Sequence, residues 1–265
     1  MKTMVDRTVL VTGAAKRLGR EIALYFAREG WNVIIHYGQS ASEAKSVVEE
    51  ICALGVKAIA LQANLSRQAE AESLIQKSID HFSRIDCLIN SAALFEYDRP
   101  SQDDHPVSTD CIERHTQINL AAPVILAQAI FRHLKNQPIS KDFVPATIQL
   151  LDQKLINLNP DYFSYTLSKS ALLTATEMMA RDFAPYMRSV GLAPGITLPS
   201  GDQSQVEFEK AHQVTPMGYS SSAHDIASAA FFLANAKSIT GTTLYVDGGQ
   251  HLLASDRDVM FKIKS

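Results

Sequence analysis

The chain has 265 residues, of which 46% are hydrophobic and 20% charged, and its formal net charge is −3. The apolar fraction can build a substantial core and excludes a mainly disordered chain. The charge provides no basic footprint for nucleic acid, and the apolar runs are far shorter than the ~20 residues that span a bilayer. Three cysteines without CxxC spacing indicate neither a disulfide framework nor a zinc site. We therefore expect a cytoplasmic protein that binds no metal, nucleic acid or membrane.

Strand-like and helix-like hydrophobic patterns alternate along the chain. Short apolar runs predict strands over 8–11, 32–37, 56–63, 86–91, 146–151, 190–193 and 243–246. Helical spacing predicts helices over 17–29, 42–54, 69–82, 109–135, 163–183 and 225–234. Strands separated by helices in this way form parallel sheets that are covered on both faces. The predicted fold class is α/β, a single doubly wound Rossmann-type domain over residues 1–265.

A loop of small residues connects the first predicted strand with the first predicted helix, over 12–19. Its small side chains let the backbone approach a pyrophosphate, whose charge suits the free N–H groups at a helix start. The spacing differs from GxGxxG, because Arg17 stands in the place of a middle glycine. We expect Gly13, Arg17, Leu18 and Gly19 to bind a dinucleotide, although such a loop can also be an ordinary strand-to-helix turn.

The end of the second predicted strand helps to choose the cofactor. Sites that are specific for NAD usually have an acidic residue there, which binds the ribose 2′-hydroxyl. Residues 31–42 contain no Asp or Glu, and the strand ends in His36 and Tyr37. Arg17 and Ser40 can instead bind a 2′-phosphate, so NADPH is favoured over NADH. The alternative for Arg17 is a solvated residue at a helix start.

Tyr165 and Lys169 lie four residues apart, which places them on one face of a predicted helix. A free phenol has a pKa near 10 and is a poor acid or base at neutral pH. A neighbouring ammonium favours the phenolate and is expected to lower that pKa. By itself the pair is a weak signal, but downstream of a glycine loop it is a strong one.

With these motifs the chain resembles the short-chain dehydrogenase/reductase family over about residues 7 to 250. The resemblance implies that Tyr165 is the proton donor, that Lys169 holds the nicotinamide ribose, and that Asn119 supports a proton-relay water. It also implies a homo-oligomer, a tetramer as in the family. Further cofactor-binding positions follow from the resemblance at His36, Tyr37, Ser40, Asn64, Leu65, Asn90, Ser91, Ala92, Pro194 and Gly195.

Most members of the family have a serine about 13 residues before the tyrosine, where this chain has Asp152. An ionised carboxyl group accepts hydrogen bonds but cannot donate them, so it suits a substrate with N–H donors better than a neutral carbonyl. This departure, with the segments 12–20 and 247–252, resembles the pteridine reductase branch and the related dihydromonapterin reductases. The resemblance implies that Phe95 stacks on a pterin; the alternative is an ordinary apolar loop residue.

Other positions depart from the branch. Gln39 stands where a basic residue is frequent, Asn64 replaces an aspartate, and Val190 replaces an asparagine. None of these changes removes a group that hydride transfer needs. The polar segment 198–214 corresponds to a substrate lid in the family, and we expect it to close over the pterin.

These observations predict an NADPH-dependent reductase of a small-molecule pteridine, such as a dihydropterin, dihydromonapterin or dihydrofolate. Hydride would pass to a ring C=N, with the substrate bound by Phe95, Asp152 and Tyr165, and Tyr165 would deliver the proton. Two alternatives stay open. One is a carbonyl reductase of 3-oxoacyl thioesters or polyols, and the other is a cofactor-binding protein of the same fold without turnover.

Overall fold

The computed structural model describes residues 6–140, 142–199 and 203–262. Its strands are β1 (Thr8–Val11), β2 (Asn32–Tyr37), β3 (Ala58–Gln62), β4 (Cys87–Asn90), β5 (Ala146–Leu150), β6 (Arg188–Pro194) and β7 (Thr243–Val246). They form one sheet in the order β3-β2-β1-β4-β5-β6-β7, and every neighbouring pair is parallel. The strand order reverses direction between β1 and β4, and ligands of such sheets bind at that point, beyond the carboxyl ends of the strands. The predicted fold class is confirmed.

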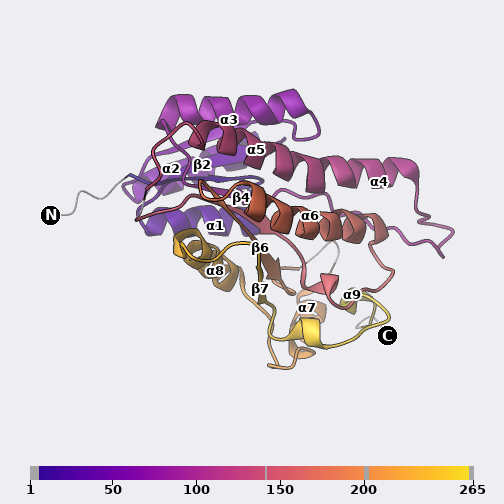
Figure 1. The fold of residues 1–265 in the computed structure, drawn as a ribbon. Helices are drawn as coiled ribbons and strands as arrows, with labels where there is room; N and C mark the ends of the chain where they lie inside the picture. Colours follow the sequence, from indigo (N-terminus) through magenta and orange to yellow (C-terminus); the bar gives the residue numbers. More distant parts are fainter. Residues whose placement is uncertain (1–5, 141, 200–202, 263–265) are drawn as a thin grey trace.

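Helices cover both faces of the sheet (Figure 1). They are α1 (Arg17–Arg28), α2 (Ala41–Ala53), α3 (Gln68–Phe82), α4 (Thr109–Thr116), α5 (Ala122–Leu134), α6 (Phe163–Asp182), α7 (Gln205–Gln213), α8 (Ala223–Asn235) and α9 (Val259–Lys262). Helix α1 packs against α8 on one face, and α3 packs against α5 on the other. No helix within the described ranges is both long and apolar enough to cross a membrane.

The two faces have separate hydrophobic cores because side chains alternate along each strand. In β1, Val9 and Val11 join the core under α1 and α8, whereas Leu10 joins the core under α3 and α5. All three side chains are fully buried. Because helices cover both faces of the sheet, successive residues of a strand such as β1 are all buried. This explains why such strands are near-continuous apolar runs in the sequence.

The structure differs from the sequence-based expectations in three places. The predicted helix over 109–135 contains a five-residue π-helical segment, Gln117–Ala121. Part of the expected lid forms helix α7. The start of α7 is stabilised by a capping box between Ser204 and Glu207. Helix α9 was not expected at all, and it lies beside α7 (Figure 1). Residues 200–202 of the expected lid lie outside the described residues.

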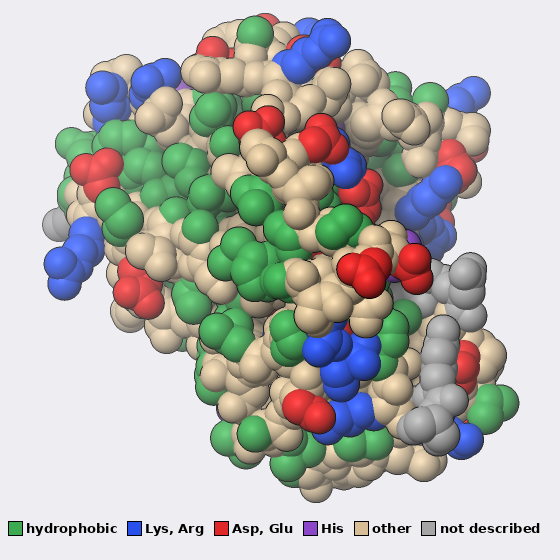
Figure 2. Space-filling model, turned by 90° about the vertical axis from the view of Figure 1, so that its right-hand side faces the viewer, with side chains coloured by type: hydrophobic (Ala, Val, Ile, Leu, Met, Phe, Trp, Pro, Cys, Tyr) green, Lys and Arg blue, Asp and Glu red, His purple; other side chains and the backbone are tan. Residues whose placement is uncertain are grey.

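Figure 2 looks onto the side of the molecule that carries α9. On this face acidic and basic side chains lie next to one another, with hydrophobic side chains between them.

Candidate active site

A cavity of about 510 Å³ opens beyond the carboxyl ends of the central strands. The loop after β1, the loop after β4, the end of β5, the end of β6 and one face of α6 all contribute to its wall. Sequence-predicted residues on the wall are Gly13, Arg17, Leu18, Gly19, Ser91, Ala92, Phe95, Asp152, Tyr165, Lys169, Pro194 and Gly195. The cavity therefore lies at the point where an α/β sheet binds its ligand.

The start of α1 is built to face an anion. Gly13 has a left-handed φ of +65°, and a Cβ at Gly19 would lie only 2.5 Å from the Gly13 carbonyl oxygen, so the loop must turn tightly. The N-cap residue, Lys16, makes no side-chain capping bond. The first-turn residues line the cavity, and uncapped N–H groups at a helix start attract phosphate. These features fit the pyrophosphate of a dinucleotide cofactor.

His36 holds this loop in place from β2. Its Nδ1 accepts a hydrogen bond from the Gly13 N–H at 3.1 Å, and its Nε2 lies 3.1 Å from the carbonyl oxygen of Ala63. Nε2 must therefore carry the proton and donate it. Burial lowers the pKa of His36, which keeps the ring neutral, as this double role requires. His36 thus positions the cofactor loop rather than lining the cavity.

Tyr165 and Asp152 are in direct contact at the cavity wall. The Tyr165 hydroxyl donates a hydrogen bond to Asp152 Oδ2 at 3.1 Å. Asp152 follows β5 and its Oδ1 accepts the backbone N–H of Lys154. Lys169 lies one turn further along α6, and its Nζ donates to the Leu150 carbonyl oxygen at 2.6 Å.

The electrostatics of this pair correct one expectation. Burial and the charge of Asp152 raise the pKa of Tyr165 well above 10, whereas we expected Lys169 to lower it. Burial lowers the pKa of Lys169 to about 8 against the opposing pull of Asp152, so part of its charge is lost near neutrality. Burial also raises the pKa of Asp152. The site consequently keeps Tyr165 protonated and makes its hydroxyl a weaker acid than that of a free phenol.

Comparison with known proteins agrees with this geometry. The family described as enoyl-(acyl carrier protein) reductase matches residues 13–251. A 3-oxoacyl-(acyl-carrier-protein) reductase FabG of Staphylococcus aureus is 30% identical, over 94% of this chain and 99% of that protein. The chain belongs to the short-chain dehydrogenase/reductase family.

Two solved structures of the family are also similar to this reductase. FolM alternative dihydrofolate reductase 1 from Brucella canis, complexed with NADP, is 32% identical with a TM-score of 0.86, covering 96% of this chain and 98% of that one. The same enzyme from Brucella suis, also in complex with NADP, is 33% identical with a TM-score of 0.82, covering 93% and 96%. Both neighbours thus bind NADP, the nucleotide that the sequence predicts for this chain.

Six expected cofactor positions do not lie on the described wall of the cavity: His36, Tyr37, Ser40, Asn64, Leu65 and Asn90. The Asn64 side chain forms a local turn with Ser66. The Asn90 amide donates to Gln149 at 2.8 Å, and its buried Oδ1 has no partner among the described residues. The positions on the cavity wall are thus those that we expected at the nicotinamide and the pyrophosphate, and the positions that we expected at the adenosine lie outside this wall.

Asn119 is fully buried in the π-helical segment. It exchanges two hydrogen bonds with the backbone of Leu94 and donates a third to Ser168 Oγ. It does not line the cavity. Its contacts show how it fixes the loop that carries Phe95, while its expected support of a relay water stays a prediction.

Phe95 is 44% exposed and lines the cavity. Its ring stacks on Tyr162, with centroids 4.2 Å apart, and meets the Tyr165 ring edge to face at 4.7 Å. Phe95 and Tyr165 thus form an aromatic part of the cavity wall, and Tyr162 supports the Phe95 ring from outside it.

Several wall residues were missed from the sequence. Among them, Asp258, Val259 and Met260 come from the C-terminal end of the described chain, beyond the segment of family resemblance. A segment as short as this one has no periodicity that could place it. Lys16 also lines the cavity, and it forms an ion pair with Glu43 at 2.7 Å. Among the described residues, the acidic, histidine and cysteine side chains form no group of three that could hold a metal.

Proposed function

We propose that this protein is an NADPH-dependent reductase of a pteridine, a dihydropterin or dihydrofolate. The observation that carries the proposal is the contact of Asp152 with the Tyr165 hydroxyl, at a cavity wall that also contains Phe95. A carboxyl group accepts N–H groups, which the edge of a pterin offers and a ketone lacks. The two Brucella dihydrofolate reductases among the structural neighbours support the same substrate class.

When bound, NADPH supplies the hydride, which a ring C=N carbon of the substrate would accept. The N–H groups of residues 17–19 would hold its pyrophosphate, the Arg17 guanidinium its 2′-phosphate, and Lys169 its nicotinamide ribose. Tyr165 would deliver the proton to the ring nitrogen, so that the substrate gains a hydride and a proton in total. Asp152 orients the Tyr165 hydroxyl and, because its pKa is raised, can take up a proton from solvent and pass it to the phenolate.

We also propose that the segment around α7 closes over the substrate and that the enzyme is a cytoplasmic homotetramer, by resemblance to the family. For the lid, the support is that Arg17 donates to the Pro199 carbonyl oxygen at 2.7 Å and that Gln203 lines the cavity. The cofactor loop and the beginning of the lid are thus already in contact.

A second candidate is a carbonyl reductase of 3-oxoacyl thioesters, which the similarity to FabG of Staphylococcus aureus favours. The wall position of Asp152 separates the two candidates. A carbonyl oxygen needs a donor, and a serine hydroxyl would provide one where the ionised carboxylate does not.

The test is NADPH oxidation with a dihydropterin, with dihydrofolate and with a 3-oxoacyl thioester. We expect the unmodified enzyme to prefer the first two. Asp152→Ser should lower dihydropterin turnover at least ~10-fold, because Tyr165 loses its carboxylate partner, and should leave or raise any activity on the thioester. Asp104→Ser changes an exposed aspartate and serves as the control. A preference for the thioester, or full dihydropterin activity in Asp152→Ser, would refute the proposal.

A further inference from the structure

The C-terminal residues 255–262, here called the C-terminal segment, form part of the substrate end of the cavity. Asp258, Val259 and Met260 line the same cavity as Phe95, Asp152 and Tyr165. The cofactor loop and the Tyr165–Lys169 pair form other parts of this wall. The C-terminal segment therefore shares the cavity wall with the expected substrate-binding residues.

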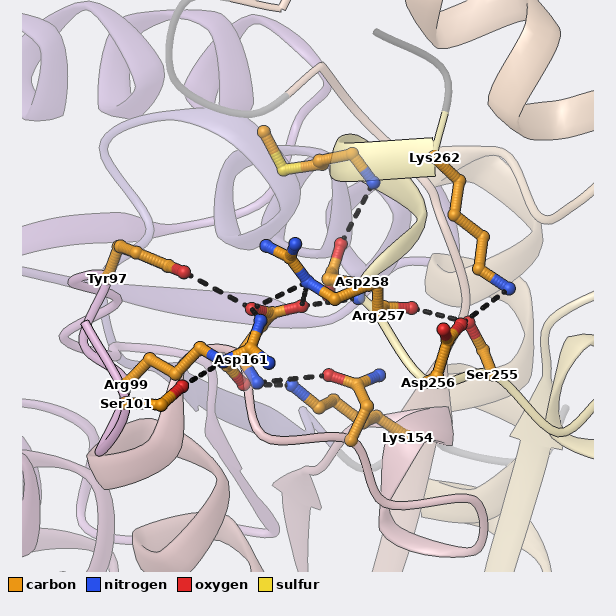
Figure 3. Close-up of polar contacts among 12 residues, drawn as sticks. Tyr97, Arg99, Ser101, Lys154, Asp161, Ser255, Asp256, Arg257, Asp258 and Lys262 are labelled. Carbon is orange, nitrogen blue, oxygen red and sulfur yellow. Dashed lines mark hydrogen bonds and ion pairs between the residues drawn. The ribbon is translucent and has the colours of Figure 1, made fainter. Parts of the chain in front are cut away.

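A single buried carboxylate anchors this segment (Figure 3). Asp161 Oδ2 accepts the backbone N–H of Asp258 at 2.7 Å and the Arg257 Nε at 2.9 Å. From the other side, the Tyr97 hydroxyl and the Arg99 guanidinium each donate to Asp161 Oδ1 at 3.2 Å. The Asp161 carboxylate is fully buried and is held by partners from both sides.

Aromatic contacts continue from this anchor to the reacting end. Phe261 packs on Tyr97 with ring centroids 5.1 Å apart. The Tyr162 hydroxyl donates to Met260 Sδ at 3.5 Å, and the Tyr162 ring stacks on Phe95. These contacts fix the position of Asp258 relative to Phe95 and Tyr165.

Asp258 is the second carboxyl group on the cavity wall. Its Oδ1 accepts the Met260 N–H at 3.1 Å, which turns the side chain at the start of α9. Burial raises the pKa of Asp258, the Lys154 ammonium opposes this, and the charges of Asp152 and Asp161 add to it. Lys154 is itself buried and donates from Nζ to the Asp161 carbonyl oxygen. Two carboxyl groups, Asp152 and Asp258, thus line the cavity, which favours a ligand that brings N–H donors.

We propose that Asp258 is a specificity-determining residue that accepts the N–H donors of the substrate's 2-aminopyrimidinone edge. This inference rests on the proposed function. A 2-amino group and the adjacent ring N–H present two parallel donors, which match the two oxygens of one carboxylate. Phe95 faces the flat ring, Asp152 and Tyr165 face the nitrogen that is protonated, and Asp258 fixes the orientation of the bicycle between them.

The test uses the full chain loaded with NADP(H) and compares Asp258→Asn with Asp256→Asn. Asp256 lies two residues away and is 87% exposed, so it is a matched control for the loss of one carboxylate from the same segment. We expect Asp258→Asn to raise KM for a dihydropterin about 10- to 100-fold with a small change in kcat, because charge-assisted hydrogen bonds are lost in binding. The control should match the unmodified enzyme.

A substrate analogue provides the readout that a purely structural role would not change. The unmodified enzyme should bind a pterin at least ~10-fold more tightly than the analogue with a 2-oxo group in place of the 2-amino group, measured calorimetrically on the NADP complex. Asp258→Asn should abolish most of this difference and leave NADPH affinity unchanged.

Two failures are distinguishable. If the unmodified enzyme reduces dihydropterins but Asp258→Asn keeps its KM and its preference for the 2-amino group, the role of Asp258 is refuted and the proposed function stands. If the unmodified enzyme neither binds nor reduces any pterin, the proposed function is refuted and the role of Asp258 falls with it.

Discussion

The roles of the Arg17 side chain and of its backbone conformation can be tested separately with two substitutions. Its side chain lies on the cavity wall, and its backbone has a left-handed φ of +53°, a conformation that favours glycine. Arg17→Gly removes the guanidinium and relieves the backbone. Arg17→Ala removes the guanidinium and keeps the strained backbone.

The expected magnitudes follow from the structure. A non-glycine residue in the left-handed region costs ~1–2 kcal/mol, and glycine avoids this cost. Part of the gain from glycine is offset, because glycine loses more conformational freedom on folding. Arg17→Gly should therefore be about 1 kcal/mol more stable than Arg17→Ala. Charge-assisted contacts to phosphate are stronger than neutral ones, but Arg17 is exposed and solvent screens it. We expect both variants to bind NADPH about tenfold more weakly and NADH almost unchanged.

Cofactor affinities are measured by fluorescence titration with NADPH and NADH at moderate salt, and stability by urea unfolding. Equal affinity of the unmodified enzyme for both cofactors, or an equal loss of both affinities in the variants, would show that Arg17 does not bind the 2′-phosphate. Equal stability of Arg17→Ala and Arg17→Gly would show that the backbone at this position is not strained.

Three further predictions concern the proton donor, its lysine and the sheet. Tyr165→Phe should lower kcat by ~100- to 10,000-fold with NADPH affinity unchanged, because the ring stays and the proton donor is lost; a rate within a few-fold of normal would exclude this role. Lys169 loses its charge as the pH rises through its pKa of about 8, so kcat/KM should fall above that pH in steady-state profiles, and a flat profile to pH 10 would contradict it. Arg188→Met should destabilise the fold by about 3 kcal/mol in urea unfolding, because the Arg188 guanidinium donates to the carbonyl oxygens of Leu233, Ala234 and Ile239. An unchanged unfolding midpoint would show that these carbonyl groups find other partners.

The sequence predicts those parts of the fold that depend on local patterns. Seven apolar runs identified the seven strands, since a strand buried on both faces leaves a continuous hydrophobic signal. The loop at Gly13 and the pair at Tyr165 and Lys169 could be recognised from the sequence because each depends on local spacing. The strand and helices that carry them also have clear hydrophobic patterns, and the structure places both on one cavity.

Features that depend on contacts between distant segments could not be predicted in this way. The raised pKa of Tyr165 arises from burial and from Asp152, 13 residues away. The π-helical turn at Asn119 shows no break in the apolar pattern around it. Asp161 helps to hold Asp258 at the cavity, and the hydrogen bond between them joins residues 97 positions apart.

The anchor at Asp161 separates two tasks within one cavity. In the proposed function the glycine loop and α6 hold the cofactor and deliver the proton. The wall residues of the C-terminal segment are attached separately, through the hydrogen bonds of Asp161. Residues 258–260 can therefore be exchanged as a cassette while Asp161, Arg257 and the Tyr165 pair are kept. For an engineer this makes the C-terminal segment the place to diversify first, since changes of substrate range there need not disturb the nucleotide site.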